Sequence, residues 1–252
     1  MEIIRYHFNS IESTNTWAKL NAHEFQQDKI TLVTADEQTA GRGRFKRRWE
    51  SPPKQNIYAT FCFFVDKYSN EIGNIPQVLA LSASAALRRL HVDPMLKWPN
   101  DLLLSGKKIG GILAETTTLD KLCVIIGIGL NINMPFETLM LIDRPATSLL
   151  VETKTSFNPE EILSDLTLIF KNDLNLFFAK GFAPFLEPYK KSLSADPSKL
   201  IHFHDNQKIW KGTFHAINQD GSLALKLNTG QIKTFITGEI LWPPVETMEL
   251  PG

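Results

Sequence analysis

A short run of cations and glycines is the part of this sequence best suited to bind an anion. It reads GRGRFKRRW over residues 41–49 and places five cationic side chains between Arg42 and Arg48, although the formal net charge of the chain is zero. Arginine offers a planar fork of donors that fits a carboxylate or a phosphate. Glycine lets backbone N–H groups come close to an anion. Taken alone, the run predicts a solvated basic loop, so the other polar motifs decide its role.

Three further motifs combine glycine or proline with polar side chains. They read KWPND at residues 97–101, GKKIGG at 106–111 and GIGLN at 127–131. The first gathers a cation, a fixed turn, an amide and a carboxylate, and paired glycines in the second mark the close approach of a ligand to a strand. Each motif alone also fits a structural role, as a turn with a packed tryptophan, an exposed hairpin or a packing adjustment in a sheet.

The common nucleotide-binding and catalytic signatures are absent. A P-loop would need glycine at position 101 and serine or threonine at position 108, where the chain has Asp101 and Lys108. A dinucleotide fingerprint would need glycine at position 46 or 132, where the chain has Lys46 and Ile132. Gly-x-Ser-x-Gly and His-Glu-x-x-His do not occur. The six histidines are scattered, which favours surface positions over a metal site.

The elements that must position these motifs follow from the apolar pattern. Strands are predicted at residues 2–8, 31–35, 56–65, 96–98, 102–104, 108–115 and 122–130. The last of these is the most apolar run and is predicted to be the central strand.

Helices are predicted between these strands and after them. Ser13 can cap a helix from Thr14 whose buried face would carry Trp17, Leu20 and Phe25. Further helices are predicted from residue 76, and from 159 to about 189.

The last part of the chain has a different pattern. After residue 197 only strands are predicted, at 200–204, 209–217, 223–227 and 231–237. Short strands with tight turns indicate a small barrel. We therefore predict two domains, residues 1–192 and 198–252.

Composition limits the class of protein. The chain has 252 residues, of which 43% are hydrophobic, so a sizeable core can form. A pI of about 7.0 argues against a general nucleic-acid binder, and the local positive charge favours a small anionic ligand. Cys62 and Cys123 lie in apolar runs and are predicted to be buried, reduced thiols. Without a signal pattern or a membrane-spanning run, a cytoplasmic protein is expected.

In this order, the motifs resemble those of the bacterial biotin protein ligases, also called biotin–acetyl-CoA-carboxylase ligases. The matching blocks are residues 13–15, Gln38 with 41–44, Trp49, 97–101, 108–111, 127–131 and, near the C-terminus, 218–221, 234–235 and 238–239. The family commonly has glycine at the position of Lys46. Some members carry a DNA-binding helix-turn-helix before the catalytic domain; the chain starts almost at the first catalytic strand, so no DNA binding is expected.

The resemblance implies an α+β fold with a catalytic domain like that of class II aminoacyl-tRNA synthetases, a mixed sheet with flanking helices, and a small C-terminal SH3-like barrel. It implies that ATP, with Mg²⁺, converts the substrate biotin to biotinyl-5′-AMP and pyrophosphate. A lysine of a biotin carboxyl carrier protein, such as that of acetyl-CoA carboxylase, then accepts the biotin. No membrane partner is expected, and the protein would be a monomer or a homodimer.

The resemblance also implies roles for single residues. Those expected in catalysis are Arg42, Arg44 and Lys108. Those expected to bind biotin are Ser13, Thr14, Asn15, Gln38, Gly41, Arg42, Lys108, Gly111, Gly127 and Leu130. Those expected to bind the nucleotide are Arg44, Arg47, Trp49, Asn100, Asp101 and Asn131, with Asp101 also expected at Mg²⁺. The basic loop is expected to be mobile when empty and to close over the reacting groups.

Two other functions are compatible with parts of the pattern. A ligase for lipoate or another acyl acid would use the same adenylation chemistry with a different acid. A nucleic-acid-binding module would use the basic loop and the barrel, although the neutral overall charge argues against it.

Overall fold

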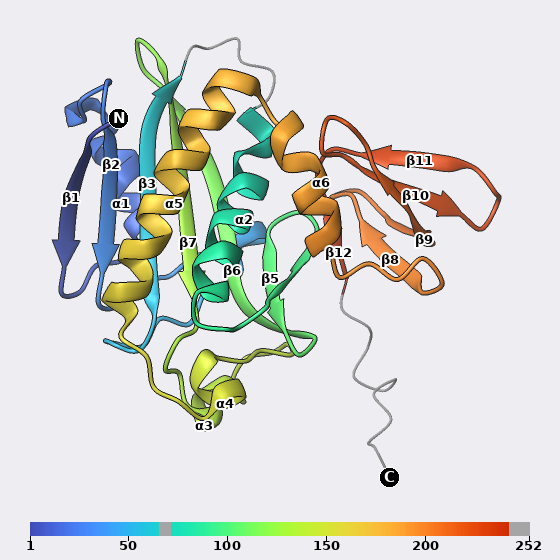
Figure 1. Ribbon diagram of the computed structural model, residues 1–252, viewed down its shortest axis with the longest axis horizontal. Coiled ribbons are helices and arrows are strands. Elements are labelled where there is room, and N and C mark those ends of the chain that lie inside the picture. Colours follow the sequence, from blue (N-terminus) through green and yellow to red (C-terminus); the bar gives the residue numbers. More distant parts are fainter. Residues whose placement is uncertain (66–71, 242–252) are drawn as a thin grey trace.

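The computed structural model describes residues 1–65 and 72–241, and its largest element is a seven-stranded mixed sheet (Figure 1). The strand order is β1-β2-β3-β7-β6-β5-β4, in which β1 and β2 run parallel and every other neighbouring pair is antiparallel. The strands are β1 (Ile3–Phe8), β2 (Ile30–Ala35), β3 (Ile57–Val65), β4 (Met95–Lys97), β5 (Asp101–Leu104), β6 (Lys107–Thr118) and β7 (Leu122–Leu130).

Helices cover both faces of this sheet. On one face lie α2 (Ile75–Arg88) and α5 (Pro159–Lys180), and on the other lies α1 (Thr14–Asn21) (Figure 1). Helix α5 begins as its sequence predicts, because the Asn158 side chain accepts a hydrogen bond from the backbone N–H of Glu160. The remaining helices are α3 (Phe136–Leu139), α4 (Leu149–Thr153), α6 (Ala183–Ser192) and three 3₁₀ turns (Ala22–Glu24, Arg44–Lys46, Ile72–Asn74).

The side-chain alternation along β7 creates the space for a site. Its even-numbered residues, from Val124 to Leu130, lie in the main core on the side of α2 and α5. On the other face, Cys123 and Ile125 pack with α1 in a second apolar cluster. Further along that face, Gly127 and Gly129 have no side chain to fill the space, so the sheet surface there stays open to a ligand.

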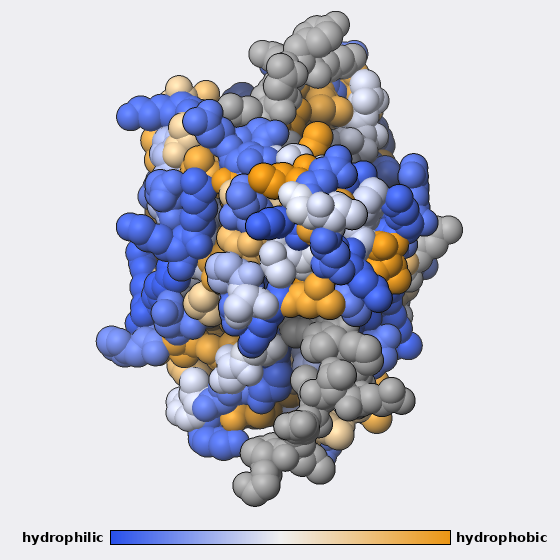
Figure 2. All heavy atoms as spheres, turned by 90° about the vertical axis from the view of Figure 1, so that its right-hand side faces the viewer, coloured by the Kyte–Doolittle hydropathy of each residue, from blue (hydrophilic) through white to orange (hydrophobic). Residues whose placement is uncertain are grey.

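A five-stranded antiparallel sheet follows the helices, in the order β11-β10-β9-β8-β12. Its strands are β8 (Leu200–His204), β9 (Ile209–Ile217), β10 (Leu223–Leu227), β11 (Ile232–Phe235) and β12 (Glu239–Ile240). Phe203 and Phe235 from this sheet belong to the same buried cluster as Trp98, which lies in the turn between β4 and β5 of the large sheet. Figure 2 shows the molecule from the side of the small sheet, where apolar atoms form small areas among hydrophilic ones.

The α+β class, the mixed sheet with flanking helices and the small C-terminal β-sheet are confirmed, as is the central place of β7. Both cysteines are free and buried, as predicted. The division into residues 1–192 and 198–252 remains a prediction, and residues 242–252 lie outside the described part of the chain. Within the described residues, no helix is long and apolar enough to cross a membrane.

The predicted buried face of α1 was wrong in part. Leu20 is 70% exposed, whereas the buried residues of the helix are Thr14, Asn15 and Ala18. Hydrophobic spacing assigned the inward face to the larger apolar side chains. The helix instead directs two polar residues inward, because they meet polar groups of the open region beside β7.

Candidate active site

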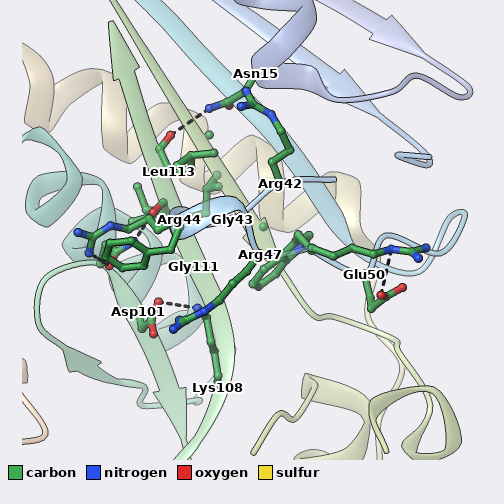
Figure 3. A pocket seen from close by; sticks show the side chains of 18 of the residues that line it. Asn15, Arg42, Gly43, Arg44, Arg47, Glu50, Asp101, Lys108, Gly111 and Leu113 are labelled. Atoms are coloured by element: carbon green, nitrogen blue, oxygen red, sulfur yellow. Dashed lines mark hydrogen bonds and ion pairs between the residues drawn. The ribbon is translucent and has the colours of Figure 1, made fainter. Parts of the chain in front are cut away.

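One cavity gathers nearly all the residues predicted for the site. Its lining includes Ser13, Thr14, Asn15, Gln38, Arg42, Arg44, Arg47, Trp49, Lys97, Asn100, Asp101, Lys108, Gly111, Gly127 and Asn131. The cavity lies over β6 and β7 and is covered by the basic loop (Figure 3). Figure 3 shows Arg42 beside Asn15 at one end and Lys108 beside Asp101 at the other.

Two residues predicted to bind biotin are not in this lining. Leu130 lies on the opposite face of β7, fully buried in the main core. Its place in the GIGLN motif suggested a ligand contact, but strand alternation directs it away from the cavity. Gly41 is the first residue of the basic loop and packs against the other end of the loop. A Cβ at this position would meet the carbonyl oxygen of Trp49 and the hydroxyl of Ser51.

The end of the cavity nearest α1 is built from interlocked polar side chains. The backbone N–H and the hydroxyl of Thr14 both donate to Oε1 of Gln38, at 2.9 and 3.1 Å. Gln38 Nε2 in turn donates to the hydroxyl of Ser51, which donates to the carbonyl of Trp49. The base of the cavity is therefore tied to the end of the basic loop by consecutive hydrogen bonds.

Thr60 continues this set of bonds beneath the cavity. Its hydroxyl is fully buried on β3 and lies 2.8 Å from Thr14 Oγ1 and 2.7 Å from Asn15 Oδ1. Asn15 uses its amide nitrogen to donate to the carbonyl of Leu113 and to Oε2 of Glu115, each at 3.1 Å. Asn15 is thus fixed by protein groups on both ends of its amide.

Glycines of β7 and β6 leave space for the cavity directly above the strand backbones. A Cβ at Gly127 would collide with the amide of Asn15, and one at Gly129 would enter the indole ring of Trp49. A Cβ at Gly111 would lie 3.0 Å from Nζ of Lys108. Glycine is needed here because α1, the loop and the lysine all approach the strand backbones closely.

The opposite end of the cavity is cationic. Nζ of Lys108 lies 2.6 Å from Oδ1 of Asp101, and the ammonium is 5.4 Å from the centre of a Trp49 ring. Arg44 donates to Oδ1 of Asn100 at 3.2 Å, and burial lowers the pKa of its guanidinium. Arginine remains charged at neutral pH despite such a shift, so two fixed cations face this end.

The small sheet also contributes to this end. Arg44 donates to the carbonyl of Gly238 at 2.9 Å, and Arg47 forms an ion pair with Glu239, whose hydrogen bond raises the pKa of Arg47. Within the described residues, the second carboxylate oxygen of Glu239 is buried without a hydrogen-bond partner. The basic loop therefore joins both sheets at the cavity.

Asn131 lines the cavity but has a structural bond as well. Its amide donates to the carbonyl of Thr147 at 3.0 Å and holds the turn that leads into α4. Ser13 caps α1 by accepting from the backbone N–H of Thr16, which leaves its hydroxyl hydrogen for donation. Of these two, Ser13 keeps the more direct capacity to bind a ligand.

Several site residues were missed by the sequence analysis. They are Thr60, Glu115 and Arg144. Lys97 and Glu239 belong to the matched blocks 97–101 and 238–239, but no site role was predicted for them. Glu115 could have been found, because Gly111, Leu113 and Glu115 share one face of β6. The contact of Glu239 with Arg47 was not predictable from the sequence, since it depends on how the two sheets pack together.

The free space in the cavity is small, about 100 Å³. Pockets that hold small-molecule ligands usually measure on the order of 300–1,000 Å³. Trp49 and the loop arginines line this space, which agrees with the expectation that the loop moves when a ligand enters.

Known proteins resemble this chain in sequence and in fold. Residues 7–133 match the sequence model of the biotin/lipoate A/B protein ligase family. The bifunctional ligase/repressor BirA of Bacillus subtilis is 30% identical over 233 residues, 87% of this chain and 69% of that protein. The biotin–(acetyl-CoA-carboxylase) ligase of Paracoccus denitrificans is 29% identical over 213 residues, 79% of this chain and 85% of that protein.

A solved structure extends the likeness to nearly the whole fold. The biotin protein ligase from Aquifex aeolicus, determined in complex with biotin and ATP, superimposes with a TM-score of 0.78 at 28% identity. The match covers 95% of this chain and 97% of that one. Both sheets therefore fall within the shared fold.

Proposed function

The chain belongs to the biotin/lipoate A/B protein ligase family, and from this membership we propose that it is a biotin protein ligase. In the proposed reaction, ATP activates biotin to biotinyl-5′-AMP, and biotin then passes to a lysine of a carrier protein. The observation that carries the proposal is a single cavity with hydrogen-bonding side chains at one end and fixed cations at the other. This arrangement matches an acid whose head is polar and whose reacting end is anionic.

The cationic end suits the first step. A carboxylate oxygen of biotin attacks the α-phosphorus of ATP, the bond to the bridging β-phosphate oxygen breaks, and pyrophosphate leaves. Both reactants are anions, so cations must hold them together and stabilise the charge that develops at the α-phosphate. Lys108 and Arg44 supply fixed positive charge there, and Arg47 adds a third cation from the same loop.

The second step needs a covered intermediate. The ε-amine of the carrier lysine attacks the acyl carbon of the mixed anhydride, the bond to AMP breaks, and the amine proton passes to solvent. Water would destroy the same anhydride, so a loop closed over the cavity favours transfer. The bonds of Arg44 and Arg47 to residues 237–239 support this closed arrangement.

The polar end favours biotin over lipoate. The ureido group of biotin both donates and accepts hydrogen bonds, whereas the dithiolane ring of lipoate does neither. A site built to hydrogen-bond a substrate discriminates strongly against an analogue that leaves its buried groups unpaired. Ser13, Thr14 and Gln38 form the polar wall of this end, because all three line the cavity and the first two are almost fully buried. A ureido group can add hydrogen bonds to this wall, whereas a dithiolane ring covers it without any.

Magnesium would accompany ATP in this proposal. Mg²⁺ is usually held by one or two carboxylates together with substrate phosphates. Asp101 fits that pattern as a carboxylate at the cationic end of the cavity, with Oδ1 on Lys108 and Oδ2 outside that ion pair. Within the described residues, no group of three or more metal-binding side chains occurs, so the phosphates would supply most of the oxygen ligands.

The carrier follows from the relatives. The Paracoccus denitrificans protein is named a ligase of acetyl-CoA carboxylase. We therefore propose the biotin carboxyl carrier domain of that enzyme, or of another biotin-dependent carboxylase, as the acceptor.

A transfer assay tests the proposal. The protein is incubated with ATP, Mg²⁺, labelled biotin and a biotin carboxyl carrier domain, with a carrier whose acceptor lysine is replaced by arginine as the control. The expected result is ATP-dependent labelling of the first carrier alone. Labelling with lipoate and none with biotin would show the alternative ligase.

A further inference from the structure

Glu115 is a carboxylate that joins the basic loop to α1 without lining the cavity itself. Its side chain is 19% exposed, and its Oε2 accepts from Arg42 at 2.8 Å and from Asn15 at 3.1 Å. Its Oε1 lies 3.7 Å from Nζ of Lys19. Both partners of Oε2 line the cavity, so Glu115 can affect a ligand through them.

Strand β6 and the side chain of Asn15 fix the position of this carboxylate. Glu115 follows Gly111 and Leu113 on the same face of β6, which directs its side chain towards α1 and the cavity. Asn15 donates to Oε2 and to the Leu113 carbonyl, while Thr60 occupies Asn15 Oδ1. Because Asn15 cannot turn without losing these bonds, the acceptor offered to Arg42 has a defined place.

Arg42 can use this acceptor and still bind a ligand. A guanidinium has five N–H donors in a planar fork, and the bond to Glu115 uses Nη2. The remaining donors are held in one orientation at the rim of the cavity. The backbone of Arg42 also pairs with that of Arg48, so holding the Arg42 side chain holds both sides of the loop.

We propose that Glu115 is a positioning residue, which anchors Arg42 and with it the closed loop so that the acyl-adenylate is retained between the two steps. The inference rests on the proposed function and adds a residue to it. A fixed anchor reduces the ordering cost that the loop would otherwise meet whenever it closes.

The direct test measures release of biotinyl-AMP. The wild-type protein and Glu115→Gln form the adenylate from biotin and ATP, pyrophosphatase removes the product pyrophosphate, and escape of the adenylate into a chase is followed. Glutamine keeps the shape of the side chain and loses its charge, so release should be roughly three- to tenfold faster, while adenylate formation changes less. In an Arg42→Gln background, Glu115→Gln should add no further increase.

Two control variants separate this role from a structural one. Lys19→Met removes the other cationic partner of Glu115 and should leave release unchanged. Glu152→Gln neutralises a comparably buried carboxylate, 16% exposed and paired with Lys107 outside the cavity, and should also leave release unchanged. Glu115→Asp, which keeps the charge but is one methylene shorter, provides a second variant if the glutamine protein does not fold.

The outcomes distinguish the two proposals. If the wild-type protein forms no adenylate with biotin, the proposed function fails. If it does, and Glu115→Gln releases the adenylate at the wild-type rate, the positioning role is refuted. Slower release by Glu115→Gln would also refute it, because Glu115 would then compete with the ligand for Arg42. Trypsin cleavage within residues 42–48 without substrates should be faster in Glu115→Gln, a readout that needs no catalysis.

Discussion

Lys107 and Lys108 are neighbours in sequence with different surroundings. Lys108 faces the cavity and pairs with Asp101, whereas Lys107 pairs with Glu152 at 2.7 Å and is 42% exposed. A register shift in the β5–β6 pairing interrupts the alternation at Ile109, so that Lys108, and not Lys107, lies on the cavity face of β6. Lys108 is just 15% exposed, and its removal leaves the carboxylate of Asp101 without this partner.

We expect Lys108→Ala to reduce biotin-dependent ATP–pyrophosphate exchange by roughly a hundred- to a thousandfold, the usual cost of losing one contact to a transition-state charge. Lys107→Ala should be nearly silent. Preformed biotinyl-AMP should restore part of carrier labelling in Lys108→Ala, since the first step is bypassed. If Lys107→Ala reduced the exchange and Lys108→Ala did not, Lys107 and not Lys108 would be the lysine that contacts the phosphates.

Lys97 is a buried cation of the cavity with an altered titration. Its side chain is 8% exposed, and burial lowers the pKa of Lys97 to about 8, a fall that the charges of Asp101 and Glu239 limit. Below pH 8 the ammonium form attracts phosphate, and above it the neutral form does not. At saturating biotin, kcat/KM for ATP reports the protonation of the enzyme–biotin complex to which ATP binds, so it should fall as pH rises through about 8.

Lys97→Met should lower kcat/KM for ATP below pH 8 and remove this fall. The measurement is ATP–pyrophosphate exchange between pH 7 and 9 at saturating biotin. Lys97→Arg serves as the control, because arginine stays charged over this range and its profile should also be flat. A fall of wild-type size in Lys97→Met would assign the titration to another group.

The site residues that could be predicted from the sequence are those in motifs that combine charge with glycine or proline. Arg44, Asn100 and Lys108 each belong to a short motif that can be recognised along the chain, and all three line the cavity. Thr60 and Glu115 were assigned only to strands. Alternation along β6 gives the face on which Glu115 lies, but the contacts of both residues with Asn15 depend on how α1 packs against β6 and β3.

The basic loop is held in place from two sides. Backbone pairing of Arg42 with Arg48 closes its base, and Arg47 meets Glu239 of the small sheet. Phe45 has a positive φ of 57°, so the tight turn at residues 44–46 places a non-glycine residue in the left-handed region. Such strain is kept only when surrounding contacts hold the loop.

Glu239→Gln should therefore loosen the loop. Trypsin cleavage within residues 42–48 should become several-fold faster in the absence of substrates, and biotin with ATP should slow it again. Glu50→Gln is the matched control, since the Arg48–Glu50 pair at 3.1 Å lies within the loop segment and does not join it to the small sheet. Equal cleavage of Glu239→Gln and wild-type protein would mean that Arg47 does not hold the loop.

Most strands were predictable because apolar periodicity depends on local sequence. β8, β9 and β10 have the predicted bounds, and β12 was missed because two residues are too few to show a pattern. The helices α3 and α4 were also missed, since four- and five-residue helices have no period to detect.

The two sheets share one continuous apolar core. Hydrogen bonds cross the junction as well, because Trp98 Nε1 and Gln77 Nε2 both donate to the carbonyl of Gly221, at 3.0 and 2.9 Å. Gly221 has a φ of +75°, and a Cβ there would meet the side-chain amides of Asn74 and Gln77. The turn before β10 thus fixes the small sheet beside the cavity.

Gly221→Ala should destabilise the protein by roughly 2–4 kcal/mol, from backbone strain together with the collision. Gly230→Ala is the control: its φ is +86° and no atom lies within 4 Å of a Cβ, so strain alone should cost about 1–2 kcal/mol. Denaturant unfolding measures both. Equal losses of unfolding free energy in the two variants would show that the junction between the sheets accommodates the added methyl group without loss of stability.

Activation of biotin in this cavity is the step on which the proposed function depends. The most direct measurement is acid-dependent exchange of labelled pyrophosphate into ATP by the wild-type protein, with biotin and lipoate compared under the same conditions. Biotin should support exchange and lipoate should not, because the polar end formed by Ser13, Thr14 and Gln38 can exchange hydrogen bonds with the ureido group of biotin and not with the dithiolane ring of lipoate. Exchange with lipoate but not with biotin, or no exchange with either acid, would contradict the account.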